Sequence, residues 1–170
     1  MSDLTWTQFT KKIHINTSLE KLYWCWATKE GITTWFLKDA KFIRNGNLLK
    51  DSDYLCAKDQ YTWFWHNWDG QEEGSILEAN GKDYFRFSFA GNCEVEIAMQ
   101  QQENAILLSL KQSKIPLDEK SKLQIFYGCS NGWTFWLTNL KAYLEHGILL
   151  NETKIDLRGF DLAGYEFVNM

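Results

Sequence analysis

The chain has 170 residues, of which 45% are hydrophobic and 24% charged, and its formal net charge at pH 7 is −4. This length and balance predict one globular domain with a sizeable core and exclude a disordered chain. The negative charge and the lack of a basic run argue against nucleic acid and anionic membrane surfaces as partners. Since no stretch approaches about eighteen consecutive apolar residues, we expect a cytoplasmic protein that does not cross a membrane.

Residues 8–16 alternate between apolar and polar side chains and predict a half-buried strand. Thr17 begins a capping box with Glu20, and apolar residues follow at helical spacing, which predicts a helix. Thr28 can cap a second short helix over KEGITTWF. The expected order at the amino end is therefore strand, helix, short helix.

The middle of the chain reads as antiparallel strands joined by short turns. Asn45-Gly46 is a strong turn dipeptide between candidate strands at 39–44 and 47–51. Residues 61–68 form an aromatic strand that we expect to be covered on both sides. Four further strands make an antiparallel meander, at 73–80, 83–89, 93–100 and 105–112.

Residues 118–147 predict one long carboxy-terminal helix, and Gly147 supplies a left-handed stop. Its apolar stripe consists of Leu123, Phe126, Ser130, Trp133, Leu137, Leu140 and Leu144. Such a stripe favours a curved sheet wrapped around the helix. The apolar tail 149–170 should dock on the domain or on a partner subunit, with Phe160, Tyr165 and Phe167 covering the pocket mouth or a second copy.

Two glycines one turn apart in this helix, Gly128 and Gly132, do not follow from core packing alone, since each costs up to about 1 kcal/mol relative to Ala. One interpretation is the close approach of a neighbouring strand or a local bend. The other is a low wall beside a cavity, with Ser130 as its polar group.

The four cysteines, Cys25, Cys56, Cys93 and Cys129, contain no CxxC pair and no histidine at ligand spacing. This pattern predicts reduced thiols, and we expect no metal site and no cofactor. A more unusual feature is the 9 Trp within 16% aromatic residues. So much ring surface can fill a core, line an apolar pocket or form an interface.

Several segments carry a resemblance to a known family: IHINTSLE at 13–20 leading to the Trp35-Phe36 pair, GSILE at 74–78, NGW at 131–133, LTNLK at 137–141 and LEHG at 144–147. Over residues 8–148 the chain resembles the START-like (SRPBCC) superfamily and, within it, the AHSA-type domain named for the activator of the heat-shock-protein-ninety ATPase. The resemblance implies an α+β helix-grip fold over residues 1–148. In that fold a curved antiparallel sheet wraps around a long C-terminal helix, and two short helices follow the first strand.

The resemblance also implies a cavity between sheet and helix that often receives an apolar small molecule, but it implies no catalytic set. We therefore expect non-enzymatic binding of a small, largely apolar ligand. Ser130 would orient its polar end, and the walls would be formed by Trp35, Trp63, Trp65, Phe85, Phe87, Phe126 and Trp133. The alternative is that these rings meet and fill the space completely.

Two other function classes stay open. One is interaction with a chaperone, as for the activator after which the family is named, or with a second copy as a homodimer. The other is a small cyclase-like or hydrolase-like enzyme, which would need a titratable group in the cavity. His66, with Glu78 and Arg86 as neighbours, is the candidate polar trio; such a trio is more often a structural ion pair or faces solvent.

Overall fold

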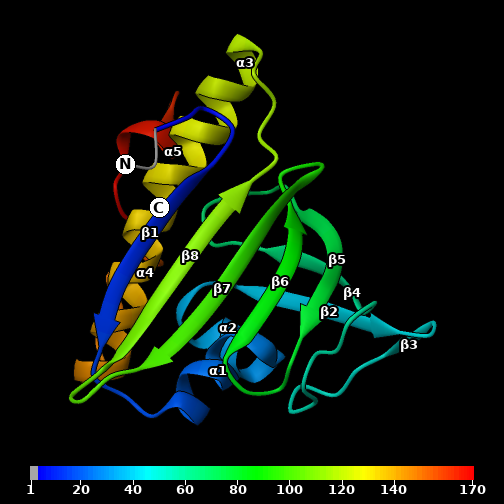
Figure 1. Cartoon of the computed structure of the whole chain (residues 1–170). Helices are drawn as coiled ribbons and strands as arrows, with labels where there is room; N and C mark the ends of the chain where they lie inside the picture. Colours follow the sequence, from blue (N-terminus) through cyan, green and yellow to red (C-terminus); the bar gives the residue numbers. More distant parts are fainter. Residues whose placement is uncertain (1–3) are drawn as a thin grey trace.

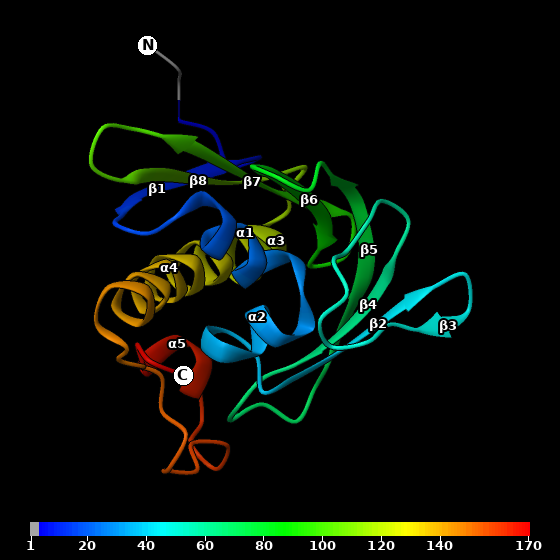
Figure 2. The ribbon, with the colours of Figure 1, turned by 90° about the horizontal axis from the view of Figure 1, so that it is seen from below.

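The structure is a computed structural model that describes residues 4–170. It is an α+β fold in which one curved antiparallel sheet holds the helices on its concave side (Figures 1 and 2). The strand order is β1-β8-β7-β6-β5-β4-β2-β3. The strands are β1 (Phe9–Ile15), β2 (Asp39–Arg44), β3 (Asn47–Leu48), β4 (Gln60–Phe64), β5 (Glu72–Ala79), β6 (Tyr84–Phe89), β7 (Cys93–Gln101) and β8 (Ile106–Ser113). The helices are α1 (Leu19–Ala27), α2 (Lys29–Trp35), α3 (Glu119–Ser121), η1 (Lys122–Tyr127), α4 (Gly128–His146) and α5 (Ala163–Glu166).

The helix-grip prediction is confirmed, including the two short helices after the first strand. The cap of α1 differs from the prediction, because Ser18 rather than Thr17 is the N-cap: its hydroxyl accepts the Lys21 N–H at 3.1 Å. The predicted cap of α2 is confirmed. Thr28 accepts the Gly31 N–H at 2.9 Å and donates to Trp24 at 3.0 Å, so that it joins the ends of α1 and α2.

The meander is present as β5 to β8, each strand paired with the next. The predicted aromatic strand over 61–68 is shorter than expected, because β4 ends at Phe64. Trp65, His66 and Trp68 therefore lie in the connection between β4 and β5. This connection runs along the end of the sheet that faces the carboxy-terminal tail.

Aromatic side chains fill the middle of the space between the sheet and the helices. The Trp35 indole, on α2, donates to the Cys25 carbonyl at 3.0 Å and crosses the Trp26 ring at a centroid distance of 4.9 Å. The largest side chains in this region are at most 2% exposed: Trp26, Trp35, Trp63, Phe85 and Phe87. The filling predicted as an alternative thus holds for the centre of the fold.

We expected one uninterrupted carboxy-terminal α-helix, and this prediction is wrong in its first part. A π-helical segment, η1, precedes α4, and the Gly128 N–H reaches back to the Leu123 carbonyl. Each residue of a π-helix turns by less than the 100° of an α-helix, so the apolar stripe is displaced at this point. Leu123 is accordingly 58% exposed. At the other end Gly147 has φ 67° and stops α4 as predicted.

The tail after α4 folds back onto the domain and ends beside α4 (Figure 2). The fully buried Asn139 side chain of α4 donates to the Trp35 carbonyl at 2.6 Å and accepts the Leu150 N–H at 2.6 Å. Asn67, in the β4–β5 connection, accepts the Leu157 N–H at 2.9 Å. Within residues 4–170, no helix is long and apolar enough to cross a bilayer.

Candidate functional site

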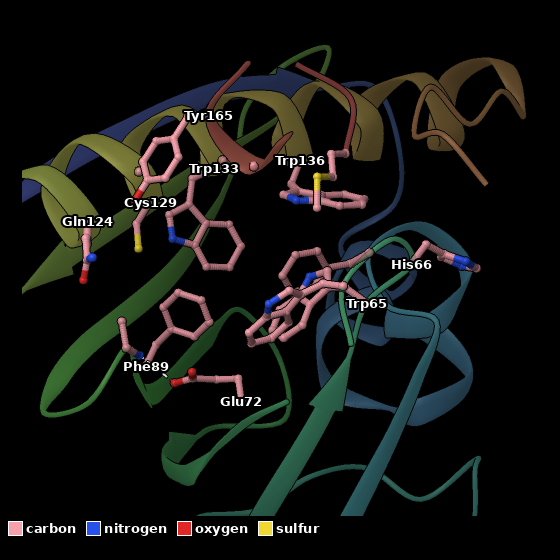
Figure 3. A pocket seen from close by; sticks show the side chains of 16 residues that line it. Trp65, His66, Glu72, Phe89, Gln124, Cys129, Trp133, Trp136 and Tyr165 are labelled. Carbon is pink, nitrogen blue, oxygen red and sulfur yellow. Dashed lines mark hydrogen bonds between the residues drawn. The ribbon is translucent and has the colours of Figure 1, made fainter. Parts of the chain in front are cut away.

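A cavity of about 590 Å³ lies at one end of the packed core, between α4, the loops at the end of the sheet and the tail (Figure 3). Its size is that of a small-molecule site. Its lining residues come from every layer of the fold: Phe36, Trp65, His66, Trp68, Glu72, Phe89, Ala90, Gln124, Gly128, Cys129, Gly132, Trp133, Trp136, Gly164, Tyr165 and Met170.

The aromatic wall is built around Phe36, which follows α2. Its ring centroid lies 5.4 Å from Trp65, 5.3 Å from Trp133 and 5.1 Å from Trp136. Phe89, at the end of β6, lies 5.4 Å from Trp133 on the other side. These contacts join two helices and two strand ends, so the wall exists only in the folded chain.

The Trp133 ring is held in place from behind. Its indole N–H donates to the side-chain oxygen of Gln112 on β8 at 2.9 Å, and Gln112 is fully buried. A buried hydrogen bond of this kind selects one ring orientation, because the N–H would otherwise lose its partner. Trp133 therefore presents a preformed surface to the cavity.

Glu72 provides the acidic group in the lining. It begins β5, and its carboxylate accepts the Ala90 N–H at 2.7 Å across the strand ends. Burial raises the pKa of Glu72, the Ala90 hydrogen bond opposes this change, and the neighbouring Glu73 adds to it. The carboxylate thus lies in a partly dehydrated position beside Phe89 (Figure 3).

The α4 side of the cavity has no side chains at two positions, because it contains Gly128 and Gly132. A Cβ at Gly132 would meet nothing within 4 Å, and one at Gly128 would lie 3.8 Å from the Tyr165 ring of the tail. No neighbouring strand approaches these two positions. Between them, burial raises the pKa of the Cys129 thiol to about 12.

The tail forms part of the cavity wall, and the cavity stays partly open to solvent. Gly164, Tyr165 and Met170 belong to its lining, and the Tyr165 ring stacks on Tyr127 of η1 at a centroid distance of 6.5 Å. A second hollow of about 510 Å³ continues between α4 and the tail, and it shares both helix glycines with the first. Movement of the tail would therefore change access to both spaces.

The residues predicted to form the site separate into three groups. Trp65 and Trp133 line the cavity. Trp35, Trp63, Phe85 and Phe87 lie in the filled centre. Phe126 instead packs on Trp6, which precedes the first strand, and on Phe9 of that strand, at centroid distances of 4.9 and 5.5 Å. Ser130 is not part of the lining. The displacement caused by η1 explains why Phe126 faces β1.

The polar trio is not assembled. Arg86 pairs with Glu94 at 2.9 Å and with Glu78 at 3.5 Å, on the side of β6 opposite the buried Phe85 and Phe87. His66 lies at the edge of the cavity, and its ring turns away from the space enclosed by the aromatic wall (Figure 3). Burial and then Lys38 lower the pKa of His66, which favours its neutral form. Within residues 4–170, no group of three His, Cys, Asp or Glu side chains is placed to hold a metal ion.

Sequence reasoning missed several lining residues, above all Phe36, Glu72, Phe89 and Trp136. Phe89 was visible as the last member of the alternating Phe85–Phe89 face, and Trp136 as the residue next to Leu137 of the apolar stripe and three after Trp133. Nothing in the sequence indicated that Glu72 belongs to the site, because this residue lies in a polar turn region just before the predicted strand at 73–80. Its role depends on the strand pairing that brings Ala90 beside it.

Comparison with known proteins places this architecture in a family. Residues 16–145 match the family model described as "Activator of Hsp90 ATPase homolog 1-like protein". A search of curated proteins finds no match.

Solved structures show the same fold at low sequence identity. A protein from Staphylococcus saprophyticus has a TM-score of 0.67 and 17% identity, over 84% of this chain and 95% of its own. The Aha1 dimer from Colwellia psychrerythraea has a TM-score of 0.63 and 17% identity, over 82% of this chain and 97% of its own. DynU16, from the dynemicin biosynthetic locus, has a TM-score of 0.60 and 16% identity, over 88% of this chain and 50% of its own.

Proposed function

The chain belongs to the Activator of Hsp90 ATPase homolog 1-like protein family, and we propose a function from its own cavity. We propose that it binds a small, largely apolar ligand, without chemical conversion, between the sheet and α4. The observation that carries this proposal is the aromatic-walled space of about 590 Å³ beside an otherwise filled core. Phe36, Trp65, Phe89, Trp133 and Trp136 would contact the apolar body of the ligand.

The titratable groups of the cavity favour binding over catalysis. A nucleophile needs an adjacent base or a lowered pKa. The pKa of Cys129 is instead raised to about 12, so its thiol is protonated at neutral pH and unreactive. The ring of His66 points away from both Cys129 and Glu72 (Figure 3). These groups are suited to orient a ligand rather than to attack it.

A neutral apolar dye, N-phenyl-1-naphthylamine, tests the proposal, with its fluorescence titrated against protein. Gly132→Phe places a ring in the open space beside α4 and should weaken dye binding by about tenfold or more, or 1.4 kcal/mol. Gly132→Ala is the matched control, since it removes the same glycine and adds one methyl group. The proposal fails if the dye does not bind the wild-type protein, or if both variants bind it equally well.

A second candidate function is protein interaction, favoured by the apolar surface of the tail. Eight apolar side chains near the carboxyl end are between 41% and 81% exposed: Ile148, Leu149, Leu150, Ile155, Phe160, Leu162, Tyr165 and Val168. Single exposed apolar residues are ordinary, but a continuous group of them indicates an interface. The partner would be a second copy of the chain or a chaperone of the Hsp90 type.

Two measurements separate these partners. Light scattering across a concentration series would show a homodimer, and the ATPase rate of a purified Hsp90 with and without this protein would show activation. Leu162→Asp should abolish either effect, because it places a charge in the apolar surface, whereas Asp161→Ala should not. A monomer at every concentration that leaves the ATPase rate unchanged would refute the interaction function.

A further inference from the structure

We propose that the cavity selects an organic cation, in which an ammonium or similar positive head is attached to an apolar body. The head would lie among the aromatic rings and close to Glu72. This inference rests on the proposed ligand-binding function and adds the charge of the ligand to it. It follows from three properties of the lining: its charges, its rings and the environment of its carboxylate.

The charges of the lining have one sign. Glu72 is the one side-chain carboxylate among the sixteen lining residues, and this described lining contains no Lys or Arg. His66 stands at the edge with a lowered pKa, so it is neutral at pH 7. An anionic ligand such as a fatty acid would meet Glu72 without a compensating positive group. A cation would meet an opposite charge in a partly dehydrated space, where electrostatic attraction is stronger than in water.

The rings around the cavity suit the same ligand. The negative face of an aromatic ring attracts a cation, most strongly for Trp and most strongly where water is excluded. Trp65, Trp133 and Trp136 all contact the ring of Phe36, with centroid distances between 5.1 and 5.4 Å. Aromatic rings recognise quaternary ammonium groups in proteins, and these Trp rings border the cavity, where such a group could reach them.

The environment of Glu72 differs from that of the other shielded carboxylates. Asp59, which is 1% exposed, is paired with Arg44 at 2.7 Å, and Glu94 is paired with Arg86 at 2.9 Å. Across residues 4–170, Glu72 has no Lys, Arg or His nitrogen within salt-bridge distance; it accepts only the Ala90 N–H. Burial raises its pKa, which means that the empty site disfavours its charge. A bound cation would provide the missing counterion.

Three probes of equal size test the proposal by titration calorimetry or ligand-observed NMR. Benzyltrimethylammonium carries the positive head, neopentylbenzene is its neutral isostere, and phenylmethanesulfonate carries a negative head. We expect the cation to bind at least about tenfold more tightly than the neutral isostere, as a dehydrated cation–π contact of about 2 kcal/mol requires. The sulfonate should bind most weakly.

Glu72→Gln then tests the assigned group. Its amide oxygen can still accept the Ala90 N–H, so the fold should be retained, and we expect the preference for the cation to fall by about tenfold. The affinity for neopentylbenzene should stay within about twofold. Glu73→Gln is the matched control, because it removes the same charge from the exposed neighbouring position and should leave the preference unchanged.

The outcomes separate this inference from the function on which it rests. If neopentylbenzene and the cation bind equally, or if N-phenyl-1-naphthylamine binds and the cation does not, the cavity is a general apolar site and the cation proposal is refuted alone. If neither the dye nor any of the three probes binds, both proposals are refuted. A preference for the cation that is undiminished in Glu72→Gln would overturn the assignment of Glu72.

Discussion

Replacing Gly132 by Ala should stabilise the protein, although the position lies inside the longest helix and beside the candidate site. The substitution removes the conformational cost of glycine in a helix interior, which is about 1 kcal/mol relative to Ala. The new methyl group would meet nothing within 4 Å, so no packing strain opposes the gain. We expect the free energy of unfolding to rise by about 0.5–1 kcal/mol.

Gly31 of α2 provides the contrast. A Cβ at that position would lie 1.9 Å from the Trp24 carbonyl oxygen and 2.8 Å from the Cys25 Cα, both backbone atoms of α1. Backbone atoms cannot turn aside as a flexible side chain can, so α1 and α2 would have to separate. Gly31→Ala should therefore destabilise the protein by about 3 kcal/mol or more, despite the same gain in helix propensity.

Urea denaturation followed by circular dichroism at 222 nm measures both effects, because the helical backbone dominates the signal at this wavelength. For a chain of this length, the Gly132→Ala gain corresponds to a rise in Tm of about 1–4 °C. The reasoning would be refuted if Gly132→Ala lost more than about 1 kcal/mol. Such a loss would mean that another segment occupies the space beside Gly132 in solution.

Two further predictions concern the buried contacts of α4 and the tail. Asn139→Leu should lower the free energy of unfolding in urea by about 2–4 kcal/mol, because the Trp35 carbonyl and the Leu150 N–H lose their partner. Thr138→Ala is the control: it lies on the exposed face of the same turn and should change the free energy of unfolding by less than about 0.5 kcal/mol. Deleting residues 150–170 should uncover the cavity and the apolar face of α4, and so increase the binding of an apolar dye or change the oligomeric state. Unchanged dye binding, solution mass and unfolding midpoint would contradict the role given to the tail.

The local patterns of the sequence predicted most elements of the fold. Alternation along β6 to β8, the Asn45-Gly46 turn, the Thr28 cap and the Gly147 stop each depend on residues close in the chain. Their preferences are set by backbone geometry and by short-range hydrogen bonds. For that reason they can be recognised without knowing what packs against them. The likeness of the LTNLK and LEHG segments to a known family added the helix-grip arrangement.

The long helix shows where such patterns end. Its apolar spacing predicts continuous α-helix through Leu123 and Phe126, yet η1 turns these residues toward solvent and toward β1. The spacing of apolar residues does not predict a π-helical segment, because α-helices and π-helices contain the same kinds of residue. In the folded chain Phe126 packs against Phe9 of β1 and against Trp6, contacts that the spacing of the helix residues does not reveal.

The sequence by itself determined the order of most elements and how much apolar surface each must bury, because composition and periodicity record both. The space between a curved sheet and the long helix was implied instead by the resemblance to the AHSA-type family. Only the tertiary structure decided which rings fill the centre and which border the cavity. Trp63 and Trp65 stand two residues apart, but the first is fully buried and the second lines the open space. Glu72 acquires its position from the end of β6. The burial of a ring and the counterion of a carboxylate depend on residues that are distant in the chain. The local sequence pattern carries no information about such residues.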